Sequence, residues 1–207
     1  GEFGVPHSIV LDSHGRLYVA DRNNARVQVF NQQGQFLAEW RNMMVPWGLT
    51  ITSNDVELRG FTITNPSGLH GVSASNRSNL LIADNVFTGI ATAIPSATSV
   101  PYAIGFACSS AAVDNIVVTN NTISQIVANG TAKSAFGVWV GDSTGNLDIT
   151  GLVIEDNRIS NIVSAGKGAY GIFINHANSV NYTGRTVAPR IVGNVITDLT
   201  GGWAHAI

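Results

Sequence analysis

The sequence predicts an all-β protein in which a coil of short parallel strands follows a small antiparallel sheet. Two repeats predict this fold. A strand-and-turn unit of about 40 residues occupies the start, and an asparagine-marked pattern with steps of 36 or 37 residues runs from about residue 48 to the end. No segment keeps a helical period with capping signals, so we expect almost no helix. The 207 residues are enough to bury a core of their own.

The first 47 residues contain four strand signals separated by turn residues. The signals lie at residues 6–11, 16–20, 26–30 and 35–40. Residues 6–11 are echoed 40 residues later by residues 46–51, and 40 residues is the length of one propeller blade. Four short antiparallel strands are also the plan of one blade, so we expect an antiparallel sheet here.

The second repeat has the form apolar-x-x-Asn-x-apolar-Ser/Thr. Its markers, at steps of 36, 36 and 37 residues, are Asn85, Asn121, Asn157 and Asn194. A shorter rung places Leu58, Phe61 and Ile63 24 residues before their counterparts. Coils that lie on one another stack like residues, so we expect inward apolar columns and asparagine hydrogen bonds between coils.

A second column supports the same repeat. It consists of a small residue followed by an apolar one, at Gly71, Gly105, Gly137, Gly171 and Ala206. Residues 48–207 therefore resemble the right-handed parallel β-helix repeats (PbH1 repeats) of the pectin-lyase-like superfamily, with four to five rungs. That fold hosts lyases, hydrolases, epimerases, adhesins and inert spikes, so the resemblance implies architecture more than activity. Residues 203–207 begin a further rung, and we expect a fragment or chimera of longer proteins, truncated at this end.

Residues 5–9 (Val-Pro-His-Ser-Ile) and 17–30 resemble an NHL repeat, more narrowly one blade of the peptidyl-α-hydroxyglycine amidating lyase propeller. The resemblance implies that His7 is a zinc ligand and that Arg22 is catalytic. The other zinc histidines and a catalytic tyrosine of that family come from blades that this sequence does not contain. The alternative is structural: His7 begins a strand and Arg22 lies in a turn. We expect residues 1–47 to cap the N-terminal end of the coil formed by residues 48–207.

Composition argues against several partners. Eleven basic residues stand against 13 acidic ones, for a net charge of −2, which provides no basic field for nucleic acid or an anionic membrane. No apolar run reaches the length of a membrane span. We therefore expect neither partner and no cofactor besides zinc at His7. The open ends of the coil favour self-association.

The carboxylates of the coil offer little for catalysis. Asp84 and Asp156 precede ladder asparagines two rungs apart, which separates them by roughly 10 Å. This is wide even for an inverting glycosidase pair, and an aspartate beside a bend is typically a turn former. The paired-aspartate signatures of polygalacturonases and the arginine motifs of pectate lyases are also missing from the sequence.

Aromatic residues suggest a binding surface instead. Trp139 and Phe173 occupy the same place in successive rungs, and Tyr182 and Arg185 lie in an inserted stretch at residues 176–189. Aromatic and arginine side chains suit sugar recognition. We therefore predict a non-catalytic β-helix module, structural or carbohydrate-binding, on a secreted or cell-surface protein, with a polysaccharide or glycan partner. The alternatives are a polysaccharide lyase, hydrolase or epimerase, and an amidoglycolate lyase remnant.

Overall fold

The computed structural model describes residues 2–4, 6–11, 15–21, 24–41, 49–51, 54–94, 100–142, 147–175 and 186–207. Within these ranges the chain consists of strands, turns and bends, and no α-helix occurs, which confirms the predicted all-β class. The described residues accordingly include no helix that could cross a membrane. The predicted boundary between residues 47 and 48 lies next to the stretch 42–48, outside the described residues.

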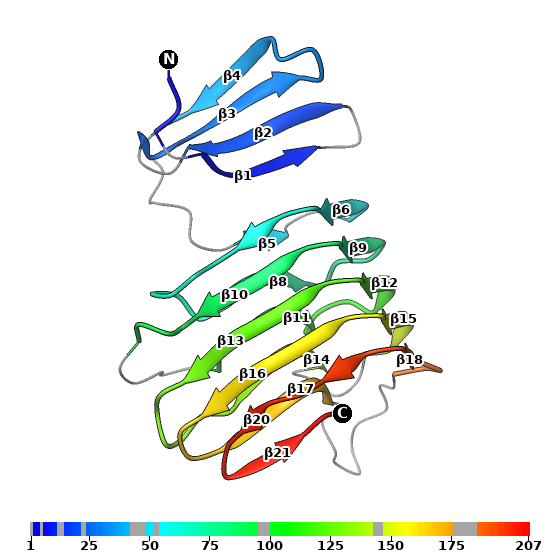
Figure 1. The fold of residues 1–207 in the computed structure, drawn as a ribbon. Helices are drawn as coiled ribbons and strands as arrows, with labels where there is room; N and C mark the ends of the chain where they lie inside the picture. The colour runs from blue at the N-terminus through cyan, green and yellow to red at the C-terminus, as the bar shows by residue number, and fades with distance from the viewer. Residues whose placement is uncertain are drawn as a thin grey trace.

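The predicted antiparallel sheet is present at the N-terminus. Its four strands, paired in chain order, are β1 (Pro6–Leu11), β2 (Arg16–Asp21), β3 (Arg26–Asn31) and β4 (Phe36–Trp40). This sheet lies at the N-terminal end of the coil, with β1 nearest to β6 (Val56–Arg59) of the first coil (Figure 1).

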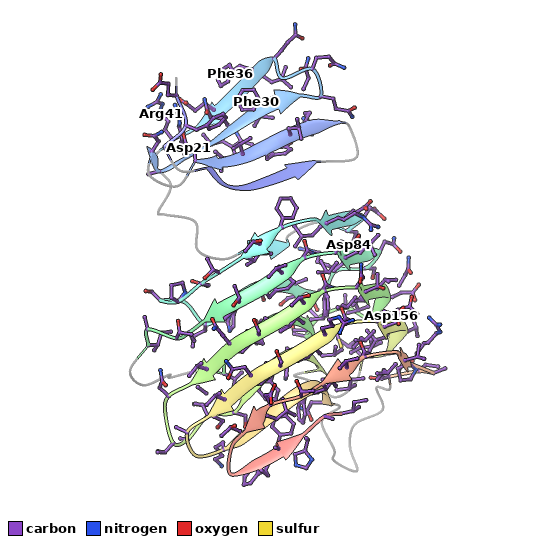
Figure 2. All side chains as sticks on the ribbon, in the orientation of Figure 1. Asp21, Phe30, Phe36, Arg41, Asp84 and Asp156 are labelled. Carbon is purple, nitrogen blue, oxygen red and sulfur yellow. The ribbon has the colours of Figure 1, made fainter. Side chains whose placement is uncertain are left out.

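A buried ion-pair network ties the N-terminal segment to this sheet. Asp21 is fully buried, and its Oδ2 accepts hydrogen bonds from Arg26 Nε at 2.6 Å and Asn24 Nδ2 at 2.8 Å. Its Oδ1 accepts the backbone N–H of Gly4 at 2.6 Å, while Arg26 also pairs with Glu39 at 2.7 Å. Because a buried charge needs such partners, Asp21 fixes the end of β2 against its neighbours (Figure 2).

This network makes the stability of the antiparallel sheet depend on pH. Burial alone would raise the pKa of Asp21, but hydrogen bonds from Asn24, Arg26 and Gly4 outweigh it and hold the pKa below its ordinary value of 3.8. A carboxylate with a lowered pKa stabilises the fold above its unfolded-state pKa, and that contribution is lost as the pH falls through the folded-state pKa. We expect amide hydrogen exchange in β2 to β4 to accelerate on acidification below about pH 4.

An Asp21→Asn variant tests this pH dependence. It should exchange faster than the parent in β2 to β4 at neutral pH, and its exchange should change less on acidification. Glu57→Gln, at an exposed carboxylate on β6, is the matched control and should follow the parent. An unchanged pH profile in Asp21→Asn would show that this carboxylate does not carry the effect.

The remainder of the described chain forms a parallel β-helix with three sheets. The β11 sheet contains β5 (Leu49–Ile51), β8 (His70–Ser75), β11 (Tyr102–Cys108), β14 (Ala135–Asp142), β17 (Gly168–Asn175) and β21 (Trp203–His205). The β12 sheet contains β6, β9 (Leu80–Ala83), β12 (Val113–Thr119), β15 (Ile149–Glu155) and β18 (Arg190–Val192). The β13 sheet contains β7 (Thr62–Ile63), β10 (Val86–Ile90), β13 (Thr122–Ala128), β16 (Arg158–Ser164), β19 (Val195–Ile196) and β20 (Leu199–Thr200). Each coil contributes one strand to each sheet, in the order β11, β12, β13 (Figure 1).

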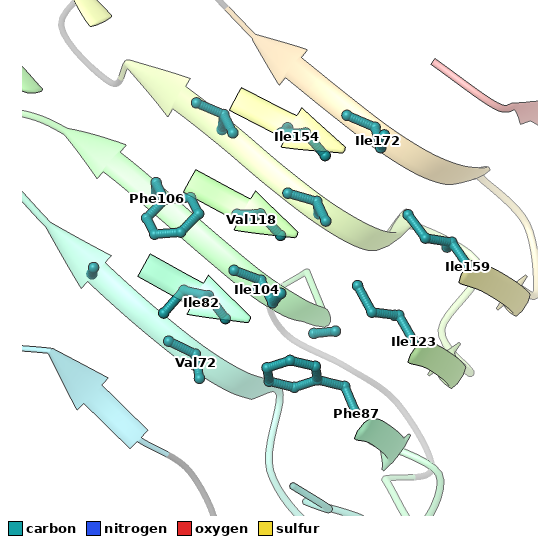
Figure 3. Close-up of a cluster of buried hydrophobic side chains, with 14 of the residues drawn as sticks. Val72, Ile82, Phe87, Ile104, Phe106, Val118, Ile123, Ile154, Ile159 and Ile172 are labelled. Carbon is teal, nitrogen blue, oxygen red and sulfur yellow. The ribbon is translucent and has the colours of Figure 1, made fainter. Parts of the chain in front are cut away.

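The core is a set of apolar columns between the three sheets. Phe87 pairs with Ile63 above and Ile123 below, and Ile82 pairs in the same way with Leu58 and Val118. All five side chains are buried, as the repeat predicts (Figure 3). The coil is therefore held together by apolar contacts between each rung and the next.

The asparagine ladder forms as the sequence predicts. Asn121 Oδ1 accepts hydrogen bonds from both the backbone N and the Nδ2 of Asn85, each at 3.0 Å. Asn157 serves Asn121 in the same way, and Asn194 serves Asn157. The first three asparagines are buried, so each satisfies backbone groups of the coil above in an environment closed to water.

The residue before each ladder position makes the bend between the β12 and β13 sheets. It has a left-handed backbone, with φ between 52° and 78°, at Gly60, Asp84, Asn120, Asp156 and Gly193. Glycine, asparagine and aspartate tolerate this conformation best. Asp84 and Asp156 therefore act as bend residues on one edge of the coil (Figure 2).

The glycine column is wrong in its second rung. Ile104 pairs with Val72 and Val138, which places Ala103 rather than Gly105 beside Gly71 and Gly137. The longer connection between β10 and β11 shifts the rung by two residues, so a spacing argument selects the wrong small residue. Gly105 instead pairs with Ser73 and Trp139, on the other face of the strand.

Candidate functional site

The outer face of the β11 sheet carries a column of aromatic rings on five successive coils. We call it the aromatic ladder, and its members, joined by strand register, are His70, Tyr102, Phe136, Tyr170 and His205. The rings stack nearly parallel, with centroids 3.9 Å apart for His70 and Tyr102, 5.1 Å for Phe136 and Tyr170, and 5.3 Å for Tyr170 and His205. In-register parallel strands produce this stacking because they place equivalent side chains directly above one another.

Trp139 and Phe173 widen this ladder. They pair in register, and neither belongs to the apolar core. The Trp139 ring lies 5.9 Å from that of Tyr102, and the Phe173 ring lies 5.1 Å from Phe136 and 4.7 Å from Tyr170. Two columns of rings thus make one continuous aromatic surface.

Glycine allows the rings to lie flat against the sheet. A Cβ added at Gly105 would overlap the ring of Tyr102, and one added at Gly141 would lie 2.5 Å from the indole of Trp139. A Cβ at Gly168 would overlap the rings of Tyr170 and Trp203. The small residues of this face are therefore required by the aromatic surface rather than by a turn.

We expect Gly105→Ala to displace the Tyr102 ring and to destabilise the coil by about 1–3 kcal/mol, because overpacking forces rings out of position. Thermal unfolding and near-ultraviolet circular dichroism measure the two effects. In a Tyr102→Ala background the same substitution should cost much less, since the clash is gone. Equal costs in both backgrounds would contradict the proposed contact.

Burial keeps the N-terminal part of the ladder uncharged. It lowers the pKa of His70 below 6.5, against a hydrogen bond to the backbone of Val100 that raises it. Burial likewise raises the pKa of Tyr102 above 10.0, against a hydrogen bond with Ser73. Both rings are therefore neutral near pH 7, and they stack without charge repulsion.

The C-terminal end of the ladder is the open part. Tyr102 and Phe136 are only 8% and 5% exposed, whereas Trp203 is 47% exposed. The indole N–H of Trp203 donates a hydrogen bond to the Tyr170 hydroxyl at 2.6 Å, and Lys167 Nζ lies 5.9 Å from the indole centroid. This end combines an accessible aromatic face, a hydroxyl and an ammonium group, which can stack on a sugar ring and bond its hydroxyl groups.

The remaining predicted site residues are not brought to this surface by the described part of the chain. Arg22, Tyr182 and Arg185 lie outside the described residues, as does the side chain of His7. Among the described residues, no three His, Cys, Asp or Glu side chains are grouped so that they could hold a metal ion. Zinc at His7 and catalysis by Arg22 therefore stay predictions.

The bend carboxylates are occupied by structural contacts. Asp84 pairs with Arg59 and accepts a hydrogen bond from Asn120 Nδ2 at 2.5 Å. The Asp84 side-chain hydrogen bonds, led by that from Asn120, lower its pKa below 3.8. An ionised carboxylate held in this way suits a structural role better than proton transfer.

Together the antiparallel sheet and the parallel β-helix define a repeat protein. The family model for the NHL repeat matches residues 3–30 of the chain. A stretch of 48 residues, 23% of the chain, is 48% identical to NHL repeat-containing protein 3 of Homo sapiens and 46% identical to the mouse protein of that name. The match spans 14% of the length of each relative. No solved structure matches the chain.

These matches confirm the predicted NHL repeat at the N-terminus. The β-helix itself is established by the strand pairing of the structure. The narrower resemblances to the amidating lyase propeller and to the pectin-lyase-like superfamily stay predictions.

Proposed function

We propose that this repeat module is non-catalytic and binds carbohydrate through the outer face of the β11 sheet. The supporting observation is the continuous aromatic surface whose accessible part is formed by Trp139, Tyr170, Phe173 and Trp203. Aromatic side chains with nearby hydroxyl and ammonium groups suit sugars because they offer both an apolar face and hydrogen-bond donors. Glycans of this kind are extracellular, which fits a secreted or cell-surface protein.

The shape of the surface favours a chain of sugars over a single one. Trp139, Phe173 and Trp203 lie on strands β14, β17 and β21, which are consecutive in the β11 sheet. Consecutive strands are about 4.8 Å apart, so the three coils span roughly 10 Å along the helix axis. The buried rings of Tyr102 and Phe136 support this surface from behind and hold it rigid.

Binding to a glycan array tests this proposal. The parent should bind at least one glycan, and Trp139→Ala and Trp203→Ala should each weaken that binding by about tenfold, because a lost aromatic contact is equivalent to roughly 1.4 kcal/mol. Trp40→Ala removes a similarly exposed tryptophan from β4 and should bind like the parent. Equal loss in all three variants, or no binding by the parent, would refute a carbohydrate site on this face.

A further inference from the structure

The asparagine ladder closes differently at its two ends. At the N-terminal end, Phe61 occupies the ladder position of the first coil, and its backbone N–H donates to Asn85 Oδ1 at 2.9 Å. The Phe61 side chain has no amide oxygen, so it offers nothing to a coil placed above it. The ladder is therefore terminated at this end by its own sequence.

The C-terminal end is left open. The backbone N–H groups of Asn120 and Asp156 donate to carbonyl oxygens of the coil below, at 3.2 and 3.1 Å, and that of Asn157 donates to Asn194 Oδ1. The corresponding N–H groups of Gly193 and Asn194 have no acceptor within the described part of the chain. The edge thus presents two backbone donors side by side.

The carbonyl of Asn194 completes the pattern. The equivalent carbonyls of Asn121 and Asn157 each accept a backbone N–H from the next coil at 2.8 Å, from Arg158 and Val195. The Asn194 carbonyl has no such donor among the described residues. An edge with two free donors and one free acceptor specifies a parallel strand bend whose side chain supplies an amide oxygen.

The apolar columns are open at the same edge. Ile154, Ile159 and Ile162 of the preceding coil are fully buried. Their register partners Ile191, Ile196 and Leu199 are only partly buried. Burying these side chains under a further coil would be favourable, at about 25 cal/mol per Å² of apolar surface.

We propose that this edge, formed by residues 190–207, binds a coil-forming segment of another polypeptide with an asparagine in ladder register. The segment has the form apolar-x-x-Asn-x-apolar-Ser/Thr and adds one parallel rung to the sheets, a form of β-strand addition. A second copy of this chain does not fit. Its first coil offers Phe61 in place of an amide oxygen, and its last coil offers the same unpaired donors.

A peptide with the sequence of residues 113–128, which contains Asn121 in its native frame, is the probe. We expect it to bind the full chain and to slow amide hydrogen exchange at residues 193–197. The matched control peptide carries Asn121→Leu and should bind about tenfold more weakly, because the Gly193–Asn194 bend then lacks its acceptor. Val195→Lys, at an exposed position on the edge, should reduce binding of the first peptide without unfolding the chain.

Three results would overturn the proposal. One is equal binding of both peptides, which would make the contact merely apolar. Another is no binding, or protection confined to other parts of the chain. The third is a concentration-dependent dimer, seen by sedimentation, that Val195→Lys dissociates, because the occupant would then be a second copy.

Discussion

Replacing Asn121 by leucine should lower the free energy of unfolding by about 3 kcal/mol. Asn121 is 1% exposed, and its side chain bonds the coils both above and below it. Leucine removes the acceptor for the backbone N–H of Asn85 and the donor for the Ile82 carbonyl, and it leaves both groups buried. Urea denaturation followed by far-ultraviolet circular dichroism measures the change.

Asn129→Ala is the control for this prediction. Asn129 is exposed in the turn after β13, and its side chain makes a single hydrogen bond to the Ile94 carbonyl, at 2.7 Å. Its loss should change the free energy of unfolding by less than about 1 kcal/mol. If the two variants were equally stable, the ladder would contribute nothing beyond an ordinary surface hydrogen bond.

Phe87→Ala should cost about 3–5 kcal/mol, the range for removing a buried aromatic ring. Phe87 is fully buried, and its ring closes the core between β10 and the β11 sheet, where it lies 3.0 Å from the position of a Cβ on Gly71 (Figure 3). The substitution leaves a cavity that the rigid coil cannot collapse to fill. The same denaturation experiment measures the loss.

Val86→Ala provides the comparison on the same strand. Val86 is 39% exposed and faces away from the core, so its substitution should cost less than about 1 kcal/mol. A small effect of Phe87→Ala, similar to that of Val86→Ala, would mean that the coil is more loosely packed than the structure shows.

The repeat made the coil predictable because equivalent residues occupy equivalent environments. Each ladder asparagine meets the same backbone groups, and each apolar column faces the same interior, so spacing alone identifies them. The bend residues were predictable for the same reason, since Asp84 and Asp156 stand where only a few residue types tolerate a left-handed backbone.

The aromatic ladder was only partly predictable. Trp139 and Phe173 are alike and evenly spaced, but His70, Tyr102 and His205 differ in type from the phenyl rings between them, so no simple pattern marks the column. Strict alternation also fails here. Phe136 and Trp139 lie three residues apart on one outer surface, because a Cβ at Gly137 would point at Ile159 while Val138 lies in the core.

The sequence could not place the NHL-derived site for a physical reason. A zinc site with an open position needs three protein ligands, and one blade supplies His7 alone. In the same sheet, sequence analysis missed the Asp21–Arg26–Glu39 network. A buried aspartate five residues before an arginine, on adjacent antiparallel strands, is the signal that could have revealed it.

The most direct test of a module that binds carbohydrate without cleaving it reads both properties from one sample. The purified chain is incubated with pectin, alginate or another polysaccharide chosen from the glycan array. Retention of the protein and the chain length of the polymer are then measured together. We expect retention that Trp139→Ala reduces, with no new reducing ends and no unsaturated products. Shortened polymer would identify an enzyme, and a polymer that retains neither form of the protein would exclude carbohydrate as the ligand.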